Sequence, residues 1–170
     1  MNGDTIRINA FGGSNITEIH GPNVTRFYTS ITGESGYCGF MNCTQLSVID
    51  LPNLSNFNSG GYHFASCNSL TNVELPKING IPYYTFSTCT NLVTISAPNV
   101  SWVNERAFNG CAKLETPSFP SLTSVAAYGF YGCKKITAFP GTGITTIGNY
   151  SFANSGITGN LTLDDLTTIG

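Results

Sequence analysis

Two acidic side chains, Asp50 and Glu74, have the type and spacing that a hydrolytic site could use. Each directly precedes a Leu-Pro dipeptide, so the two carboxylates hold equivalent positions in neighbouring copies of one sequence pattern. A lyase or a glycosidase would use such a pair as its acid and its base or nucleophile. Serines, Ser96 and Ser118, hold that position in the next two copies, and Glu115 is the third acidic candidate. Because the pair is surrounded by Ser and Thr, we predict a solvated surface, no catalytic residue and no enzyme.

The six cysteines could form disulfides or a metal site. Five of them recur at one position of the repeating pattern: Cys43, Cys67, Cys89, Cys111 and Cys133. Zinc ligands cluster as in Cys-x-x-Cys, whereas these thiols would form a column, so no metal site is predicted. Ser14 and Ser155 replace them in the outer copies, which indicates buried free thiols at a position that needs a small side chain. The sequence leaves open a disulfide between Cys38, in an insertion, and Cys43.

The two histidines, His20 and His63, have no adjacent cysteine or carboxylate pair in the sequence. We expect both to be solvated loop residues and not metal ligands. No cofactor is predicted.

Aromatic residues recur two positions before the phenylalanine that opens each copy: Tyr62, Tyr84, Tyr128 and Tyr150, with Arg106 filling the gap. Stacked copies would align them along one edge. They would form either a stripe that binds sugar rings or a protein partner, or a part of the repeat that covers a turn. Tyr83 and Trp102 would add aromatic surface near this region.

A 22-residue period organises the chain. Residues 1–170 form one expected array, whose copies open near Phe11, Phe40, Phe64, Phe86, Phe108, Phe130 and Phe152. Such a period is typical of a solenoid. The segment 28–39 is about eight residues longer than the matching stretch of other copies, so the second copy begins later than the period predicts. Two extra residues within 58–61 shift the start of the third copy in the same way. The array ends at the phase where it begins, which suggests a piece cut from a longer array.

Within one copy, Ile95 and Ala97 have the spacing of inward-facing strand residues, so Thr94 and Ser96 should face outward. Pro98 should end this strand. A second short strand should include Val103, and the Phe-x-x-Cys segment should close the coil with a turn or a short helix. Six coils stacked at the strand spacing of roughly 4.8 Å would be roughly 30 Å long.

The pattern Phe-x-x-Cys-x-x-Leu-x-x-Ile-x-Leu-Pro, from Ile6 to Ile169, resembles the BspA-like (Treponema pallidum type) leucine-rich repeat. This resemblance implies a β-rich leucine-rich-repeat solenoid of right-handed coils, with a parallel sheet on its concave face and a second array of short strands. It also implies a secreted or surface protein, in some members an adhesin, without a catalytic motif to carry over.

Composition excludes several classes of partner. Only 9% of residues are charged, the net charge is −2, and only Lys134 and Lys135 are adjacent among the seven basic residues. We therefore expect no nucleic acid partner. No apolar run approaches the roughly 20 residues that span a membrane, and no signal peptide is visible, so any signal would lie upstream.

We therefore expect an extracellular or cell-surface recognition module that binds a protein or a glycan. The expected ligand-binding residues are those that face outward or are aromatic: Asp50, Asn72, Glu74, Thr94, Ser96, Trp102, Thr116, Ser118, Tyr83 and Tyr84. Val48 and the 28–39 loop would belong to the same face. The alternative is a rigid spacer in a surface protein or a phage tail fibre.

Overall fold

The computed structural model describes residues 5–7, 10–28, 39–57, 60–138, 142–158 and 164–170. Its strands contain two or three residues each, and the described residues contain no helix. The strands are β1 (Thr5–Arg7), β2 (Glu18–His20), β3 (Arg26–Tyr28), β4 (Val48–Asp50), β5 (Asn72–Glu74), β6 (Gly80–Ile81), β7 (Thr94–Ser96), β8 (Trp102–Val103), β9 (Thr116–Ser118), β10 (Ser124–Val125), β11 (Thr146–Ile147) and β12 (Thr168–Ile169). All pairings are parallel, as a solenoid requires.

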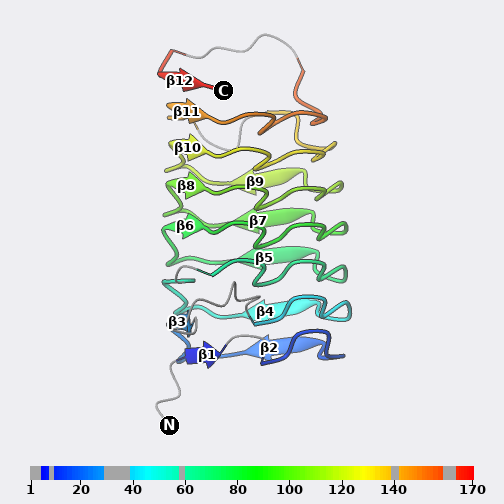
Figure 1. Cartoon of the computed structure of the whole chain (residues 1–170). Helices are drawn as coiled ribbons and strands as arrows, with labels where there is room; N and C mark the ends of the chain where they lie inside the picture. Colours follow the sequence, from blue (N-terminus) through cyan, green and yellow to red (C-terminus); the bar gives the residue numbers. More distant parts are fainter. Residues whose placement is uncertain (1–4, 8–9, 29–38, 58–59, 139–141, 159–163) are drawn as a thin grey trace.

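One side of the coil carries the strands β2, β4, β5, β7 and β9, which we call the first array (Figure 1). In β4 and β5 the central residues, Ile49 and Val73, are buried, whereas both outer residues are exposed. β7 follows the same alternation around Ile95. The predicted inward and outward positions are thus confirmed, and each of these strands ends before its proline, which has no N–H for a ladder.

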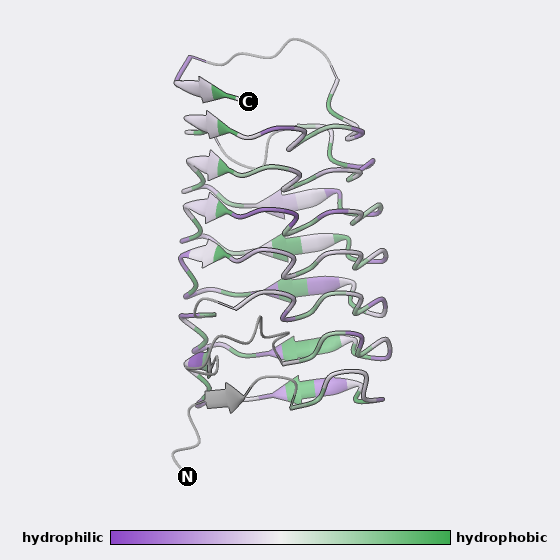
Figure 2. Cartoon of the chain, viewed as in Figure 1, coloured by the Kyte–Doolittle hydropathy of each residue, from purple (hydrophilic) through white to green (hydrophobic). Residues whose placement is uncertain are grey.

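The second array lies on another side and includes a five-stranded sheet in the order β12-β11-β10-β8-β6 (Figure 1). Its register pairs each small apolar residue with the one 22 positions later, as Ile81 with Val103 and Val103 with Val125. The strands of this sheet end in green in Figure 2, and Ile81, Val103 and Val125 are buried in the core. β1 and β3 form a separate pair.

Turns close each coil at the Phe-x-x-Cys segments, where the prediction allowed a turn or a short helix. The opening phenylalanines form one column, with ring centroids 5.0–5.6 Å apart and interplanar angles of 2–14°. Phe40 to Phe130 in this column are buried, and Phe11 at its end is 43% exposed. This stacking connects all coils through one continuous apolar core.

Each column cysteine is a buried free thiol, as predicted, but it is also a hydrogen-bond donor. Its Sγ donates to the carbonyl of the phenylalanine that opens the preceding coil, as Cys89 does to Phe64 at 3.1 Å. The same bond recurs at 3.0–3.1 Å for the other four cysteines. Burial raises the pKa of the Cys89 thiol to about 12, which keeps the proton that this bond needs. Cys38 lies outside the described residues.

Within the described residues, the paired part of the first array ends at β9, which contains Pro117. Thr116 and Ser118 direct their backbone groups toward β7: the Thr116 N–H donates to the Val93 carbonyl, and the Ser118 carbonyl accepts from Ala97. Peptide groups alternate along a strand, so residue 117 faces the next coil. Because proline has no N–H, the edge of β9 that faces the next coil lacks one hydrogen-bond donor.

Candidate functional site

The hydrogen-bonded ladder of the first array is interrupted between β4 and β5. β2 pairs with β4 in one sheet, while β5 pairs with β7 and β7 pairs with β9 in a separate sheet. Residues 47–51 and 71–75 are all described, and no backbone hydrogen bond joins these two segments. Figure 1 shows the wider separation between β4 and β5 than between β5 and β7.

The interruption follows from the local sequence. β4 and β5 begin at residues 48 and 72, which is two residues more than the offset between β5 and β7. Insertion alone does not open a ladder, because β2 and β4 begin 30 residues apart and still pair. The second difference is His63, since the residue before the opening phenylalanine is Thr85, Ala107 or Gly129 in later copies. We attribute the opening to both changes together.

His63 lies in the core of this junction, and the prediction of a solvated loop residue is wrong. Its ring is fully buried and stacks on Phe27 at 5.1 Å and near Phe57 at 4.7 Å. Nε2 is 3.0 Å from the Gly60 carbonyl, whereas Nδ1 is buried and has no hydrogen-bond partner. Burial lowers the pKa of His63 from 6.5 to about 3, so the imidazole is neutral at pH 7 and donates from Nε2.

The turns stay connected across the junction. The Phe40 N–H donates to the His63 carbonyl at 2.9 Å, and the Asn42 N–H donates to the Ala65 carbonyl at 2.8 Å. The Cys67 thiol donates to the Phe40 carbonyl at 3.1 Å. The coils therefore separate along the first array while their Phe-x-x-Cys turns remain bonded.

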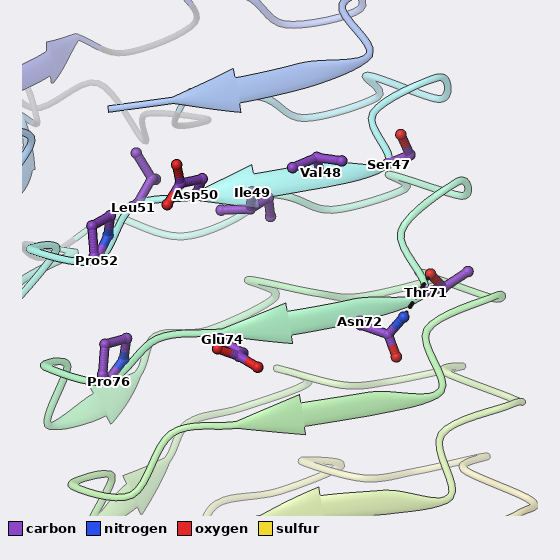
Figure 3. Close-up of a pocket in the computed structure, with 10 residues that line it drawn as sticks. All are labelled: Ser47, Val48, Ile49, Asp50, Leu51, Pro52, Thr71, Asn72, Glu74 and Pro76. Carbon is purple, nitrogen blue, oxygen red and sulfur yellow. Dashed lines mark hydrogen bonds between the residues drawn. The ribbon is translucent and has the colours of Figure 1, made fainter. Parts of the chain in front are cut away.

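A cleft of about 450 Å³ occupies the opened junction. Figure 3 shows β4 along one wall and β5 along the other, with Asp50 and Glu74 on facing walls near the proline ends of the strands. Ser47, Thr71 and Asn72 line its opposite end. Among the described residues, its lining contains two carboxylates and no Lys or Arg side chain. The cleft thus presents acidic and neutral polar groups to solvent.

Asp50 also contacts His20, which is exposed as predicted but lies in β2 and not in a loop, and which has carboxylate neighbours that its sequence surroundings did not indicate. His20 Nδ1 lies 3.2 Å from Asp50 Oδ2, and its Nε2 lies 3.1 Å from Glu18 Oε2. Parallel pairing of β2 with β4 brings His20 opposite Asp50. The hydrogen bond with Glu18 and then that with Asp50 raise the pKa of His20 above 6.5. All three side chains are more than half exposed, so this group is a surface ion cluster at one border of the cleft.

The other outward residues of the first array form a polar surface beside the cleft. Asn72 accepts a hydrogen bond from the Thr94 hydroxyl at 2.7 Å, and its amide nitrogen donates to Thr71 at 3.1 Å (Figure 3). Ser96, Thr116 and Ser118 are exposed on the following strands. Within the described residues, no group of three His, Cys, Asp or Glu side chains is arranged to hold a metal ion.

The tyrosine column stacks as the spacing suggests. Tyr62 and Tyr84 lie 4.4 Å apart, the Arg106 guanidinium lies between Tyr84 and Tyr128 at 5.6 and 4.6 Å from the ring centroids, and Tyr150 follows at 5.2 Å. All five have positive φ angles of 54–60°, which non-glycine residues adopt at a cost of roughly 1–3 kcal/mol. This conformation directs the Tyr84 N–H to the Glu105 carbonyl of the next coil. These contacts favour a structural role for the column.

The expected aromatic candidates lie away from the acidic ones. Trp102 belongs to β8 in the second array, where its indole covers Gly80 and is 38% exposed. A Cβ at residue 80 would lie 2.0 Å from that indole, so only glycine fits. Tyr83 stands edge-on to Tyr62 and Tyr84. The predicted residues therefore fall on two surfaces and not on one.

The open junction itself was missed by the sequence reasoning. Ser47, Thr71 and the unpaired backbone groups of β4 and β5 were not among the candidates. The available signals were the two extra residues within 58–61 and the large side chain at His63.

Comparison with known proteins supports the fold. A family model described as BspA type Leucine rich repeat region (6 copies) matches residues 4–137 and 60–170. A leucine-rich repeat protein from Eubacterium ventriosum is 22% identical, with a TM-score of 0.69 over 95% of this chain and 48% of that chain. One from Bacteroides ovatus is 22% identical, with a TM-score of 0.68 over 96% and 48%.

The T. pallidum leucine rich repeat protein is 19% identical, with a TM-score of 0.54 over 82% of this chain and 79% of that chain. The chain spans about half the length of the first two solved structures. No curated protein matches it. In the described part of the chain, no helix has the length and apolar character needed to cross a membrane.

Proposed function

Since this chain belongs to the BspA-type leucine-rich repeat family, we propose that it is a recognition module, secreted by a bacterium or displayed on its surface, that binds a protein or glycan. Repeats of this family are generally non-catalytic. The ligand face is the exposed side of the first array, and the cleft between β4 and β5 lies within it. Adhesion is the activity that such binding would support.

One observation carries this proposal: side chains that face outward from the first array differ between coils, while the inward ones stay apolar and buried. At one outward position the residues are Asp50, Glu74, Ser96 and Ser118, all of them exposed. The inward neighbours Ile49, Val73 and Ile95 are buried. A fixed core with a varied polar face leaves that face free to define ligand specificity.

A binding screen against glycan arrays and extracellular-matrix proteins tests the proposal. We expect a ligand whose affinity falls about tenfold, or about 1.4 kcal/mol, in Glu74→Ala. Trp102→Ala on the second array is the matched control and should leave the affinity unchanged. Loss of binding in Trp102→Ala alone would instead place the ligand face on the second array.

A rigid spacer is the second candidate, and the continuous stack of phenylalanine rings favours it. The rings from Phe11 to Phe152 and the five cysteine bonds tie successive coils together without relying on the surface. The absence of any ligand in the screen, with a monomeric and cooperatively unfolding chain, would favour this function over recognition.

A further inference from the structure

We propose that the cleft between β4 and β5 is a saccharide-binding site, in which sugar hydroxyls bridge the peptide groups that the open ladder leaves unpaired. This inference rests on the recognition function proposed above. It specifies the class of the ligand and the place where it binds.

The hydrogen bonds to β2 show which peptide groups of β4 face the cleft. The Val48 N–H donates to the Thr17 carbonyl, and the Asp50 carbonyl accepts from the Gly21 N–H. Residues 48 and 50 therefore point their backbone groups toward β2, and the intervening peptide groups point the other way. The groups of β4 that face the cleft are Ser47 C=O, Ile49 N–H, Ile49 C=O and Leu51 N–H.

The opposite wall follows from the hydrogen bonds to β7. The Leu75 N–H donates to the Ser96 carbonyl, and the Thr71 carbonyl accepts from the Thr94 N–H. Residues 71, 73 and 75 thus point their backbone groups toward β7. The groups of β5 that face the cleft are Asn72 N–H, Asn72 C=O, Glu74 N–H and Glu74 C=O.

These eight groups form four donor–acceptor pairs, in the order in which β5 and β7 pair one coil later. Each pair consists of an N–H on one wall opposite a C=O on the other. A hydroxyl accepts from the N–H and donates to the C=O with a single oxygen, whereas a guanidinium only donates and a carboxylate only accepts. A polyhydroxylated ligand therefore satisfies the walls better than a charged side chain does.

The distance between β4 and β5 also favours a polyhydroxylated ligand. A paired ladder has strands roughly 4.8 Å apart, and inserting one hydroxyl oxygen between N–H and C=O widens this to at most about 7.6 Å. Insertion of a whole peptide strand would need roughly 9.6 Å. Cα atoms of β4 and β5 come within 8 Å of one another. The cleft is thus too narrow for an added strand, whereas the width that one layer of hydroxyls needs stays below this limit.

The side chains around the cleft complement a sugar as well. Asp50 and Glu74 are exposed on facing walls and can accept from neighbouring hydroxyls, and Asn72 can both donate and accept. Val48, 37% exposed, and the prolines Pro52 and Pro76 supply apolar surface for C–H groups. The volume of about 450 Å³ lies within the roughly 300–1,000 Å³ of small-molecule sites.

The first test compares the intact chain with a variant that closes the cleft, on a glycan array and with maltotriose, cellotriose and mannotriose in solution. The closing variant lacks Asn58 and Ser59 and carries His63→Thr, which restores the spacing and the small side chain of later copies. A control with Asn58→Gly and Ser59→Gly keeps the length. We expect saccharide binding to be kept in the control and lost in the closing variant.

The second test locates the ligand on the intact chain, so it does not depend on how the variant folds. With the best array saccharide at about nine times its Kd, the amides of Ile49, Leu51, Asn72 and Glu74 should exchange about tenfold more slowly. The amides of Val73 and Leu75 on the β7 side are the internal control and should not change.

Each outcome bears on the inference. A saccharide that binds without protecting these four amides, or binds the folded closing variant equally well, overturns the cleft site but leaves recognition standing. The absence of any saccharide binding also overturns it. If matrix proteins then still bind, the proposed function survives without this ligand class, and if nothing binds, both fail.

Discussion

The junction between β4 and β5 and the junction between β5 and β7 join coils of the same repeat, yet only the second has a hydrogen-bonded ladder in the first array. Both junctions keep the stacked phenylalanines and the cysteine bond, through Phe40, Phe64 and Cys67 in one case and Phe86 and Cys89 in the other. The turn side of the coil therefore holds the stack together even where the strand side opens. A repeat protein can thereby acquire a polar cleft without losing its core.

The largest expected effect concerns His63, which belongs to the open junction alone. Its pKa is about 3 in the folded chain and about 6.5 when exposed, so the unfolded chain binds the proton more readily between these values. Stability is therefore fully present above pH 6.5 and falls as the pH drops toward 3, by about 4–5 kcal/mol at about 1.4 kcal/mol per pH unit. Urea unfolding as a function of pH measures this loss.

His63→Leu is the matched variant for that titration, because leucine fills the same apolar site without a titrating group. We expect its stability to change less between pH 6.5 and 3 than that of the intact chain. If this variant loses as much stability between pH 6.5 and 3 as the intact chain does, carboxylates and not His63 cause the loss.

Closing the ladder should have the next largest effect. The variant without Asn58 and Ser59 and with His63→Thr gains up to four backbone hydrogen bonds between β4 and β5. At a net contribution of about 0.5–1 kcal/mol each, we expect unfolding to cost about 2–4 kcal/mol more. Chemical denaturation at pH 7 measures the change, and equal or lower stability than in the Asn58→Gly, Ser59→Gly control would contradict our explanation of the opening.

Removing a thiol donor should cost about 0.5–1.5 kcal/mol, because the buried carbonyl loses one hydrogen bond and keeps the one from the backbone N–H of its own turn. Cys89→Ala does this at the closed junction and Cys67→Ala at the open one. Ser at either position restores a donor and should recover most of the stability. At the open junction we also expect local loosening of residues 40–57, which hydrogen exchange detects. Equal exchange in both alanine variants would mean that the two junctions are equally strong.

The last prediction needs no substitution and concerns amide hydrogen exchange in the intact chain. Ile49 and Leu51 hold the same repeat positions as Val73 and Leu75, but only the latter pair faces a bonded strand. We expect the first pair to exchange faster by orders of magnitude at equal pH. Similar protection of both pairs would show that the ladder is closed in solution.

The regular part of the fold was predictable because it depends on local spacing. Phe86, Cys89, Ile95 and Val103 each recur at 22 residues, and a position that repeats in sequence must stack on itself in a solenoid. The candidate site was predictable only in part. Asp50 and Glu74 were identified as neighbours, whereas the ion cluster with His20 was missed, because strand pairing across 30 residues brings it to Asp50.

The sequence by itself determined the family, the order of the strands, the inward and outward residues and the buried thiols, since all of these follow from one repeating pattern. Tertiary structure decided where the pattern fails. Two extra residues and one large side chain looked like a minor irregularity in the sequence. Whether the His63 side chain faces solvent or enters the core depends on its packing against Phe27 and Phe57, which come from earlier coils. In the folded chain His63 is buried against them, and the ladder between β4 and β5 is open.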